Sequence, residues 1–270
     1  MTGHLQIELA AHATGRTYIS RQSFHAPMHL SKPHWDGNCL IVQAVNCTAG
    51  LFSGDHIDLS VHSLSGSRAI ITSPSAQRAY QARGPVAFAE ITQSFAIDAG
   101  AWLEVCPEIF IPQRGARVRQ RTRIDLAADA GLFFIESLAP GRVGSAESYA
   151  FEVLDWTTDL YLDNELLARE RYRLSPEEQS ILTLRRYFPD AYYASCYLAA
   201  PELSEVTDFR QSVQNLCGEG LEVATSFLSP TIATIKLLAR DSMNLRTGLL
   251  SLREYCYAAL KRPIPAWRKL

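Results

Sequence analysis

Hydrophobic and polar positions alternate along most of this chain, which is the pattern of half-buried β-strands. The alternation covers residues 5–9, 17–24, 56–62, 89–97 and 117–126. Further strands are predicted at 102–105, 131–136, 154–162, 221–228 and 232–239. Helical spacing appears chiefly in the last quarter, at 206–216 with Ser204 as N-cap, and in a helix that begins at Asp241 or Ser242 and ends before Pro263.

These elements predict a mainly β, α+β fold in one domain spanning 1–270, with a β-strand scaffold over 1–200 and a helix-strand-strand-helix part over 201–270. Strands do not alternate with helices, which argues against a doubly wound nucleotide-binding sheet. The sequence also lacks a glycine-rich phosphate loop ending in Lys-Ser/Thr, a nucleophile elbow and an H-E-x-x-H motif. We therefore expect no nucleotide hydrolysis by this chain.

Composition narrows the class of protein further. The 26 basic and 28 acidic residues nearly cancel, so charge gives no reason to expect binding to nucleic acid or to an anionic membrane. No apolar run approaches the roughly 20 residues that a membrane span needs, and no secretion signal is visible. The six cysteines are scattered without a C-x-x-C pair, as a reducing compartment allows. The expectation is a cytoplasmic protein.

A glycine-bracketed loop precedes one of the predicted strands. Gly50 and Gly54 flank a short apolar insert, and Asp55 follows directly before the strand at 56–62. Glycine adopts positive φ without strain, so the pair predicts a tight loop that presents Asp55 at a strand edge. The carboxylate could reach a cavity there, or it could simply cap the turn.

Three further acids occupy similar places. Glu136 ends a nearly uninterrupted apolar strand, so its charge needs a partner, for which Arg142 is the expected candidate. Glu147 follows the Gly141-Arg142 turn, and Glu170 precedes Arg171. Three interpretations stay open: a general acid/base pair, an acidic conduit for a hydrated cation, or ordinary buried ion pairs.

An arginine stripe occupies one face of the predicted strand at 117–126; its members are Arg117, Arg119, Arg121 and Arg123. It could grip an acidic partner bidentately. It could instead pair with an acidic stripe on a later strand, formed by Asp155, Asp159 and Asp163. We favour the second interpretation.

All seven histidines lie before Ser63, and three of them fall at His25, His29 and His34. Imidazole is a common ligand of transition metals, nickel included. However, His25 and His29 would lie about 13 Å apart on an extended segment, and His34 would face the other way. Surface or cross-strand packing is therefore the favoured role, and metal binding by this group stays undecided.

Several segments together resemble the urease accessory protein D family (UreD/UreH). They are AGLFSGDHIDLSV, ITSPSAQRAY, AWLEVCPEIFIP, RGAR, ESLAPGRVGSAESY and LARERYRL, in that family's order and at about its spacing. The resemblance covers nearly the whole chain. It departs from the family's usual pattern at Cys47-Thr48-Ala49-Gly50, where Pro-Pro-Gly-Gly is common, and at Arg78, where lysine is common.

The resemblance implies a β-helix-like scaffold with two C-terminal helices that acts as a non-catalytic chaperone. It implies binding to urease apoprotein and to two further accessory proteins, one a GTPase, and help in delivering nickel through an interior passage. Nickel would be held transiently at most, with no tightly bound cofactor. The acids that the resemblance assigns to the passage are Asp55, Glu136, Glu147 and Glu170. Its motif positions are Gly50, Gly54, Thr72, Arg78, Tyr80, Gly141, Arg142 and Arg171.

Two alternatives remain at this stage. One is a β-solenoid hydrolase or lyase that uses paired carboxylates, which aromatic residues lining a groove beside the pair would favour. The other is a divergent relative that serves another client. The C-terminal helix, with more apolar positions than one core-facing stripe needs, is expected to carry part of the partner-binding surface.

Overall fold

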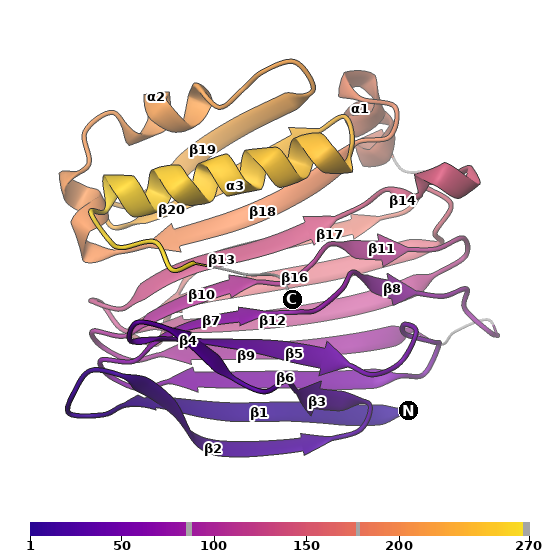
Figure 1. Ribbon diagram of the computed structural model, residues 1–270. Helices are drawn as coiled ribbons and strands as arrows, with labels where there is room; N and C mark the ends of the chain where they lie inside the picture. Colours follow the sequence, from indigo (N-terminus) through magenta and orange to yellow (C-terminus); the bar gives the residue numbers. More distant parts are fainter. Residues whose placement is uncertain (85–87, 177–178, 267–270) are drawn as a thin grey trace.

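The computed structural model describes residues 1–84, 88–176 and 179–266, and these form two facing β-sheets with helices on one side (Figure 1). The strands of the seven-stranded sheet are β1 (Thr2–Ala11), β2 (Thr17–His25), β6 (His56–Ser63), β9 (Ala89–Ile97), β12 (Arg117–Leu126), β16 (Val153–Leu162) and β17 (Glu165–Leu174). They are ordered β17-β16-β12-β9-β6-β1-β2.

The second sheet has eleven strands. They are β3 (Met28–Leu30), β4 (His34–Asp36), β5 (Cys39–Asn46), β7 (Arg68–Thr72), β8 (Gln77–Ala79), β10 (Trp102–Cys106), β11 (Phe110–Pro112), β13 (Gly131–Leu138), β18 (Tyr192–Ala199), β19 (Leu221–Ser229) and β20 (Ile232–Ala239). Its main path runs β19-β20-β18-β13-β10-β7-β5-β3, and a small hairpin of β14 (Gly141–Arg142) and β15 (Glu147–Ser148) lies beside it.

The chain crosses repeatedly from one sheet to the other. From β5 to β13 it alternates between the two sheets, so neighbours within each sheet are parallel: β1, β6, β9, β12 and β16 in one, β5, β7, β10 and β13 in the other. Antiparallel strands β2 and β17 close the first sheet, and β18, β20 and β19 extend the second. The mainly β, β-helix-like scaffold expected from the sequence is confirmed.

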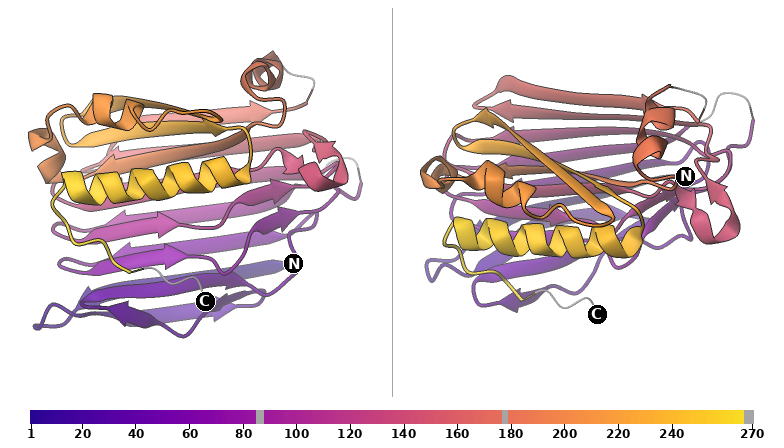
Figure 2. Two further views of the ribbon diagram at one scale, coloured as in Figure 1. Left: turned by 45° about the horizontal axis from the view of Figure 1, so that its top comes forward. Right: turned by 90° about the horizontal axis from the view of Figure 1, so that it is seen from above.

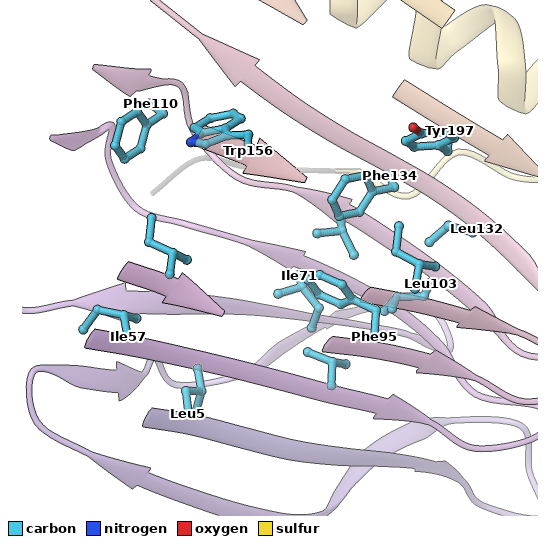
Figure 3. Packing of buried hydrophobic residues seen from close by; sticks show 14 of the residues in the cluster. Leu5, Ile57, Ile71, Phe95, Leu103, Phe110, Leu132, Phe134, Trp156 and Tyr197 are labelled. Atoms are coloured by element: carbon cyan, nitrogen blue, oxygen red, sulfur yellow. The ribbon is translucent and has the colours of Figure 1, made fainter. Parts of the chain in front are cut away.

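Alternation along each strand divides the apolar residues between two cores. The inner core fills the space between the sheets and contains Leu5, Phe95, Leu103 and Phe134, all at most 1% exposed (Figure 3). The outer core lies between the eleven-stranded sheet and the helices. Phe133, next to Phe134, points into this second core because successive strand residues face opposite sides.

Among the described residues, three α-helices accompany the sheets: α1 (Gln179–Tyr187), α2 (Phe209–Gln214) and α3 (Ser242–Ala259). Helices α2 and α3 cover β18, β19 and β20 on the outer face of the larger sheet (Figures 1 and 2). The prediction for α3 is confirmed, since the Asp241 carboxylate caps it by accepting from the Asn244 N–H at 2.8 Å.

The predicted helix at 206–216 is shorter than expected. Pro201–Glu205 forms a 3₁₀ turn that includes Ser204, and Asp208 at φ 58° breaks the chain direction before α2 begins at Phe209. Helix α1 was not predicted. Among the residues of α1 whose burial is described, Ile181 is fully buried, Leu184 is half-buried and Leu182 is 45% exposed, and nine residues are too few to give a clear helical repeat in the sequence.

A buried ion pair fastens α3 to the sheet. Arg253 Nε and Nη2 donate to the Glu104 carboxylate of β10 at 2.5 and 2.9 Å, and the Tyr257 hydroxyl donates to the same carboxylate at 2.7 Å. Trp102 Nε1 in turn donates to Tyr257 at 3.0 Å. Glu104 is 0% and Arg253 6% exposed, so the two charges depend on each other for solvation.

Candidate functional site

Segments from distant parts of the sequence meet at one end of the sheets. The glycine loop lies against the strand β8 segment, where Leu51 bridges Ala79 and the Tyr80 hydroxyl donates to Ala49 O at 3.1 Å. Gly50 has φ 155°, and a Cβ there would approach Arg78 O to 2.7 Å. Glycine is therefore required at Gly50 for this close packing.

Arg142 belongs to the same end of the molecule. It makes a bidentate pair with Glu147, with nitrogen–oxygen distances of 2.9 and 2.7 Å. These hydrogen bonds hold the pKa of Glu147 below its ordinary value. The expectation that Arg142 neutralises Glu136 is wrong, because the β14–β15 hairpin turns Arg142 toward Glu147 instead.

Asp55 is mostly buried at the exit of the glycine loop. Its carboxylate accepts from the Met1 amino group and from the Phe52 N–H, both at 2.8 Å. Thr72, another motif position, donates to Cys106 O at 2.9 Å and joins β7 to β10. Both side chains hold the loops in place.

A cavity of about 160 Å³ leads inward from these loops. Its outer lining includes Gly50, Thr72 and Arg78, and its inner lining includes Gln93 of β9. Gln93 lies on the face of β9 that points between the sheets, on the same side as Phe95. The cavity therefore connects the motif loops with the interior.

Three polar side chains continue from Gln93 across the inner face of the seven-stranded sheet. Gln93 pairs in register with Thr122, Thr122 with Thr158, and Thr158 with Glu170. We call these four residues the interior polar row. Side chains at the same level of adjacent strands lie about 4.8 Å apart, so the row crosses the interior at a right angle to the strands.

Glu136 of β13 faces this row from the opposite sheet. Thr158 donates to Glu136 Oε2 at 3.0 Å, Thr122 lies 3.2 Å from Oε1, and Gln120 donates to Oε1 as well. Glu136 is 7% exposed, and burial raises its pKa to about 7, although the hydroxyl donors oppose the rise. The carboxyl group therefore exchanges its proton near neutral pH.

Glu170 ends the row at the edge strand β17. Ser195 donates to it at 2.9 Å, Tyr197 at 2.8 Å and Tyr193 at 3.2 Å, and Lys236 of β20 completes an ion pair. Burial alone would raise the pKa of Glu170, but Lys236 and the hydroxyl donors lower it below its ordinary value. At about pH 7, where Glu136 is half protonated, Glu170 is therefore ionised.

Some polar atoms around these acids lack partners among the described residues. The buried Tyr172 hydroxyl, Trp156 Nε1 and Thr234 hydroxyl make no hydrogen bond there. Tyr172 packs against Trp156 and Tyr193, with ring centroids 5.7 and 6.1 Å apart. Unpaired buried hydroxyls are costly, so these atoms are suited to a polar guest.

The predicted acids thus divide into separate locations. Glu136 and Glu170 are brought together inside, whereas Asp55 and Glu147 lie at the loops. Asp55 precedes β6, which is four positions from β17 in its sheet, so Asp55 and Glu170 are not direct neighbours; that both line one passage stays a prediction. Arg171 points to the outer face, 3.6 Å from Asp155, away from Glu170.

Sequence reasoning missed Gln93, Gln120, Thr122, Thr158 and Lys236. The sequence did contain a signal for the first four. Each occupies a position where the alternation of its strand calls for an apolar, inward-facing residue. In β12, Gln120 and Thr122 alternate with arginines in the same phase as Val118 and Ile124. A polar residue in an inward-facing position marks either a buried network or a site.

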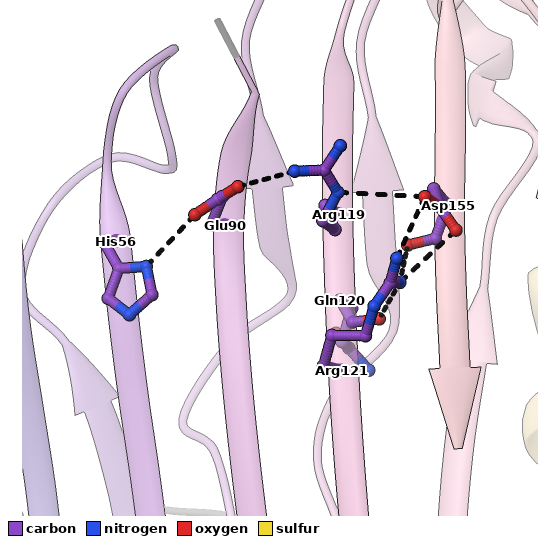
Figure 4. A network of polar contacts seen from close by, with 6 residues as sticks. All are labelled: His56, Glu90, Arg119, Gln120, Arg121 and Asp155. Carbon is purple, nitrogen blue, oxygen red and sulfur yellow. Dashed lines mark hydrogen bonds and ion pairs between the residues drawn. The ribbon is translucent and has the colours of Figure 1, made fainter. Parts of the chain in front are cut away.

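The arginine stripe is largely matched by acids on the outer face of the seven-stranded sheet (Figure 4). Arg121 donates to Asp155 at 3.0 Å, and Arg119 bridges Glu90 at 2.9 Å and Asp155 at 3.7 Å. The expected pairing with Asp155 is confirmed. Asp159 pairs with Arg169 instead, and Asp163 accepts from the Ala128 N–H in a turn.

The histidines lie outside the interior. His4 and His25 stack at 6.2 Å, and His62 lies 2.9 Å from Asp98. Within residues 1–84, 88–176 and 179–266, no three His, Cys, Asp or Glu side chains are grouped so as to hold a metal ion. The same residues include no helix long and apolar enough to span a membrane.

The fold and site define a β scaffold, built mainly of parallel strands, whose interior carries charged side chains and is connected to glycine-containing surface loops. A family model described as "UreD urease accessory protein" matches residues 1–269. The chain therefore belongs to the UreD urease accessory protein family.

Individual relatives agree with this assignment. The urease accessory protein UreD of Opitutus terrae is 38% identical over 263 residues, covering 96% of both chains. UreD of Halalkalibacterium halodurans is 28% identical over 208 residues, covering 77% of this chain and 76% of its own. UreD of Deinococcus radiodurans is 32% identical over 182 residues, covering 66% of this chain and 65% of its own.

Proposed function

We propose that this chain is a non-catalytic scaffold for urease maturation. In this proposal it binds urease apoprotein and two further accessory proteins, one a GTPase, in the cytoplasm. It assists delivery of nickel, which is cargo rather than a resident cofactor. Membership in the UreD urease accessory protein family supports the general role.

The observation that carries the nickel part is the paired Glu136 and Glu170 at the interior polar row. A hydrated divalent cation needs oxygen ligands that hold it weakly enough for release, and carboxylates and hydroxyls supply these. Glu136, with a pKa of about 7, can exchange its proton for a cation at neutral pH. A closed Cys/His site would bind nickel more strongly and release it slowly.

The route proposed for the cation begins at the motif loops. It enters the cavity of about 160 Å³ bounded by Gly50 and Thr72, reaches Gln93, and follows Thr122 and Thr158 to Glu170. Glu170 and Lys236 retain 22% and 32% side-chain exposure, so the far end of the row reaches solvent. Asp55 and Glu147 do not line this cavity, and we assign them to holding the loops beside it in place.

The test is nickel-dependent activation of urease apoprotein in the presence of its accessory proteins. Glu136→Gln and Thr158→Val should lower activation severalfold while complex assembly, measured by co-purification, stays unchanged. Glu165→Gln on the same strand as Glu170 is the matched control, because Glu165 is exposed at the start of β17. Normal activation by both interior variants would refute the interior route.

A hydrolase acting through paired carboxylates is the second candidate. It is favoured by the aromatic side chains beside the pair: Trp156, Tyr172, Tyr193 and Tyr197. Against it, Glu136 is 7% exposed between two sheets, where a general acid cannot reach a glycosidic oxygen of a polymer. Release of reducing sugar by wild type and not by Glu136→Gln would establish it.

A further inference from the structure

Lys236 places a positive charge at the solvent end of the interior polar row. It lies on β20, in register with Ser195 of β18, which is itself in register with Glu136 of β13. Its Nζ atom donates to Glu170 Oε2 and, at 2.6 Å, to Ser195 Oγ. The ammonium also lies 5.2 Å from the centroid of the Tyr197 ring.

This position is the one that a cation bound to Glu170 would occupy. Besides Lys236, the Glu170 carboxylate contacts only neutral donors among the described residues, namely the hydroxyls of Ser195, Tyr197 and Tyr193. Hydroxyl oxygens can turn their lone pairs toward a metal ion when the ammonium leaves. The unpaired Tyr172 hydroxyl on the same strand adds another oxygen.

The lysine is able to leave. Its side chain is 32% exposed and is a flexible four-carbon stem, so the ammonium can swing into water while the stem stays against the protein. The movement would cost little solvation, because an ammonium is strongly hydrated in water. Glu170 is fixed by three hydroxyl donors and would stay behind.

We propose that Lys236 is a tethered competitor cation, which a divalent ion must displace to occupy the Glu170 end of the row and which displaces that ion again on release. The inference rests on the proposed function and adds a specificity residue to it. Competition weakens equilibrium binding of the cargo ion, and it keeps Glu170 neutralised when the row holds no ion. The two carboxylates of Glu136 and Glu170 balance the charge of one divalent cation. When the Lys236 ammonium is the cation instead, it balances one carboxylate, and the other carboxyl group is better protonated.

The other groups that face this position come from three strands. Tyr172 lies on β17, Tyr193 and Tyr197 on β18, and Glu136 on β13. Burial raises the pKa of all three tyrosines, so they stay neutral at physiological pH. Glu136 and Glu170 are therefore the carboxyl groups that face the position of the ammonium.

The experiment is titration calorimetry of the purified, tag-free full chain with nickel chloride at pH 7.5. Lys236→Met, which keeps the length and removes the charge, should bind nickel at least tenfold more tightly than wild type. Lys236→Arg, which keeps a charge, should resemble wild type. Lys236→Met combined with Glu136→Gln should lose the gain, and because it keeps all seven histidines it corrects for nickel bound at the surface.

Lys236→Gln, which can still donate to Glu170, provides a second neutral variant should Lys236→Met unfold. Equal nickel affinity of wild type, Lys236→Gln and Lys236→Met would overturn the proposal and leave Lys236 as a fixed counterion. Failure of this proposal can be distinguished from failure of the proposed function. Tighter binding by Lys236→Met with normal urease activation by Glu136→Gln would keep the competitor role and reject the interior delivery route.

Discussion

The buried carboxyl group of Glu136 should make stability depend on pH in a measurable way. Its pKa of about 7 in the folded protein exceeds the ordinary 4.5 of an unfolded chain. A group whose pKa rises on folding contributes stability below pH 4.5, and that contribution is lost as pH rises through about 7. Glu136→Gln mimics the protonated form, since Thr158 can turn its hydroxyl to accept from the new amide.

The magnitude follows from the two pKa values. Each tenfold change in proton affinity is worth about 1.4 kcal/mol, so the full loss is about 3 kcal/mol. Glu136→Gln should therefore be about 1 kcal/mol more stable than wild type at pH 5 and about 3 kcal/mol more stable at pH 8. The difference in stability should reach a plateau above pH 7, because Glu136 is then ionised in both the folded and the unfolded chain.

The assay is urea unfolding of both proteins at pH 5, 6, 7 and 8, followed by tryptophan fluorescence and circular dichroism. Coincident transitions by the two probes would license a two-state treatment. Glu165→Gln serves as the exposed control and should give a difference that stays flat with pH. A flat difference for Glu136→Gln as well, or a wild type that gains relative stability toward pH 8, would mean that Glu136 is ionised in the fold.

Three further changes test other parts of the structure. Arg253→Met should lower the free energy of unfolding in urea by about 3–5 kcal/mol, because it leaves the Glu104 charge unpaired in the outer core. Adding Glu104→Leu should recover most of the loss, and similar values for the single and double variants would contradict this. Asp241→Ala should cost about 1 kcal/mol and lower Tm by a few degrees through loss of the α3 N-cap; an unchanged Tm would count against the cap. Arg121→Glu should cost about 1 kcal/mol, and Asp155→Arg added to it should restore part of that; loss of partner binding at unchanged stability would instead assign the arginine stripe to an interface.

The sequence could predict the scaffold because strand alternation is a local signal. β6, β9 and β12 follow it closely, and α3 carries both its cap and its apolar spacing. The parallel pairing and the division between two sheets depend on contacts far apart in the chain, which alternation does not encode. Helix α1 spans nine residues, which is too short for its helical spacing to stand out in the sequence.

The candidate site was only partly predictable for a similar reason. Glu136 stood out as an acid at the end of an apolar run and Glu170 as an acid before Arg171, but their proximity depends on how β13 stacks over β16 and β17. Arg142 was assigned to Glu136 because it is near in sequence, whereas the hairpin turns it to Glu147. Lys236, 66 positions beyond Glu170, becomes its partner only when β20 joins the sheet through β18.

The parallel stacking of strands also sets how an interior route can evolve. Gln93, Thr122 and Thr158 are equivalent positions on the parallel strands β9, β12 and β16, and Glu170 continues the row from the antiparallel strand β17, so three spacings of about 4.8 Å give a path of about 14 Å. Duplicating one coil of the chain would lengthen that path by a single step and leave the register of the other coils intact. The length of the proposed route is therefore counted in coils, and it can be adjusted without redesigning either end.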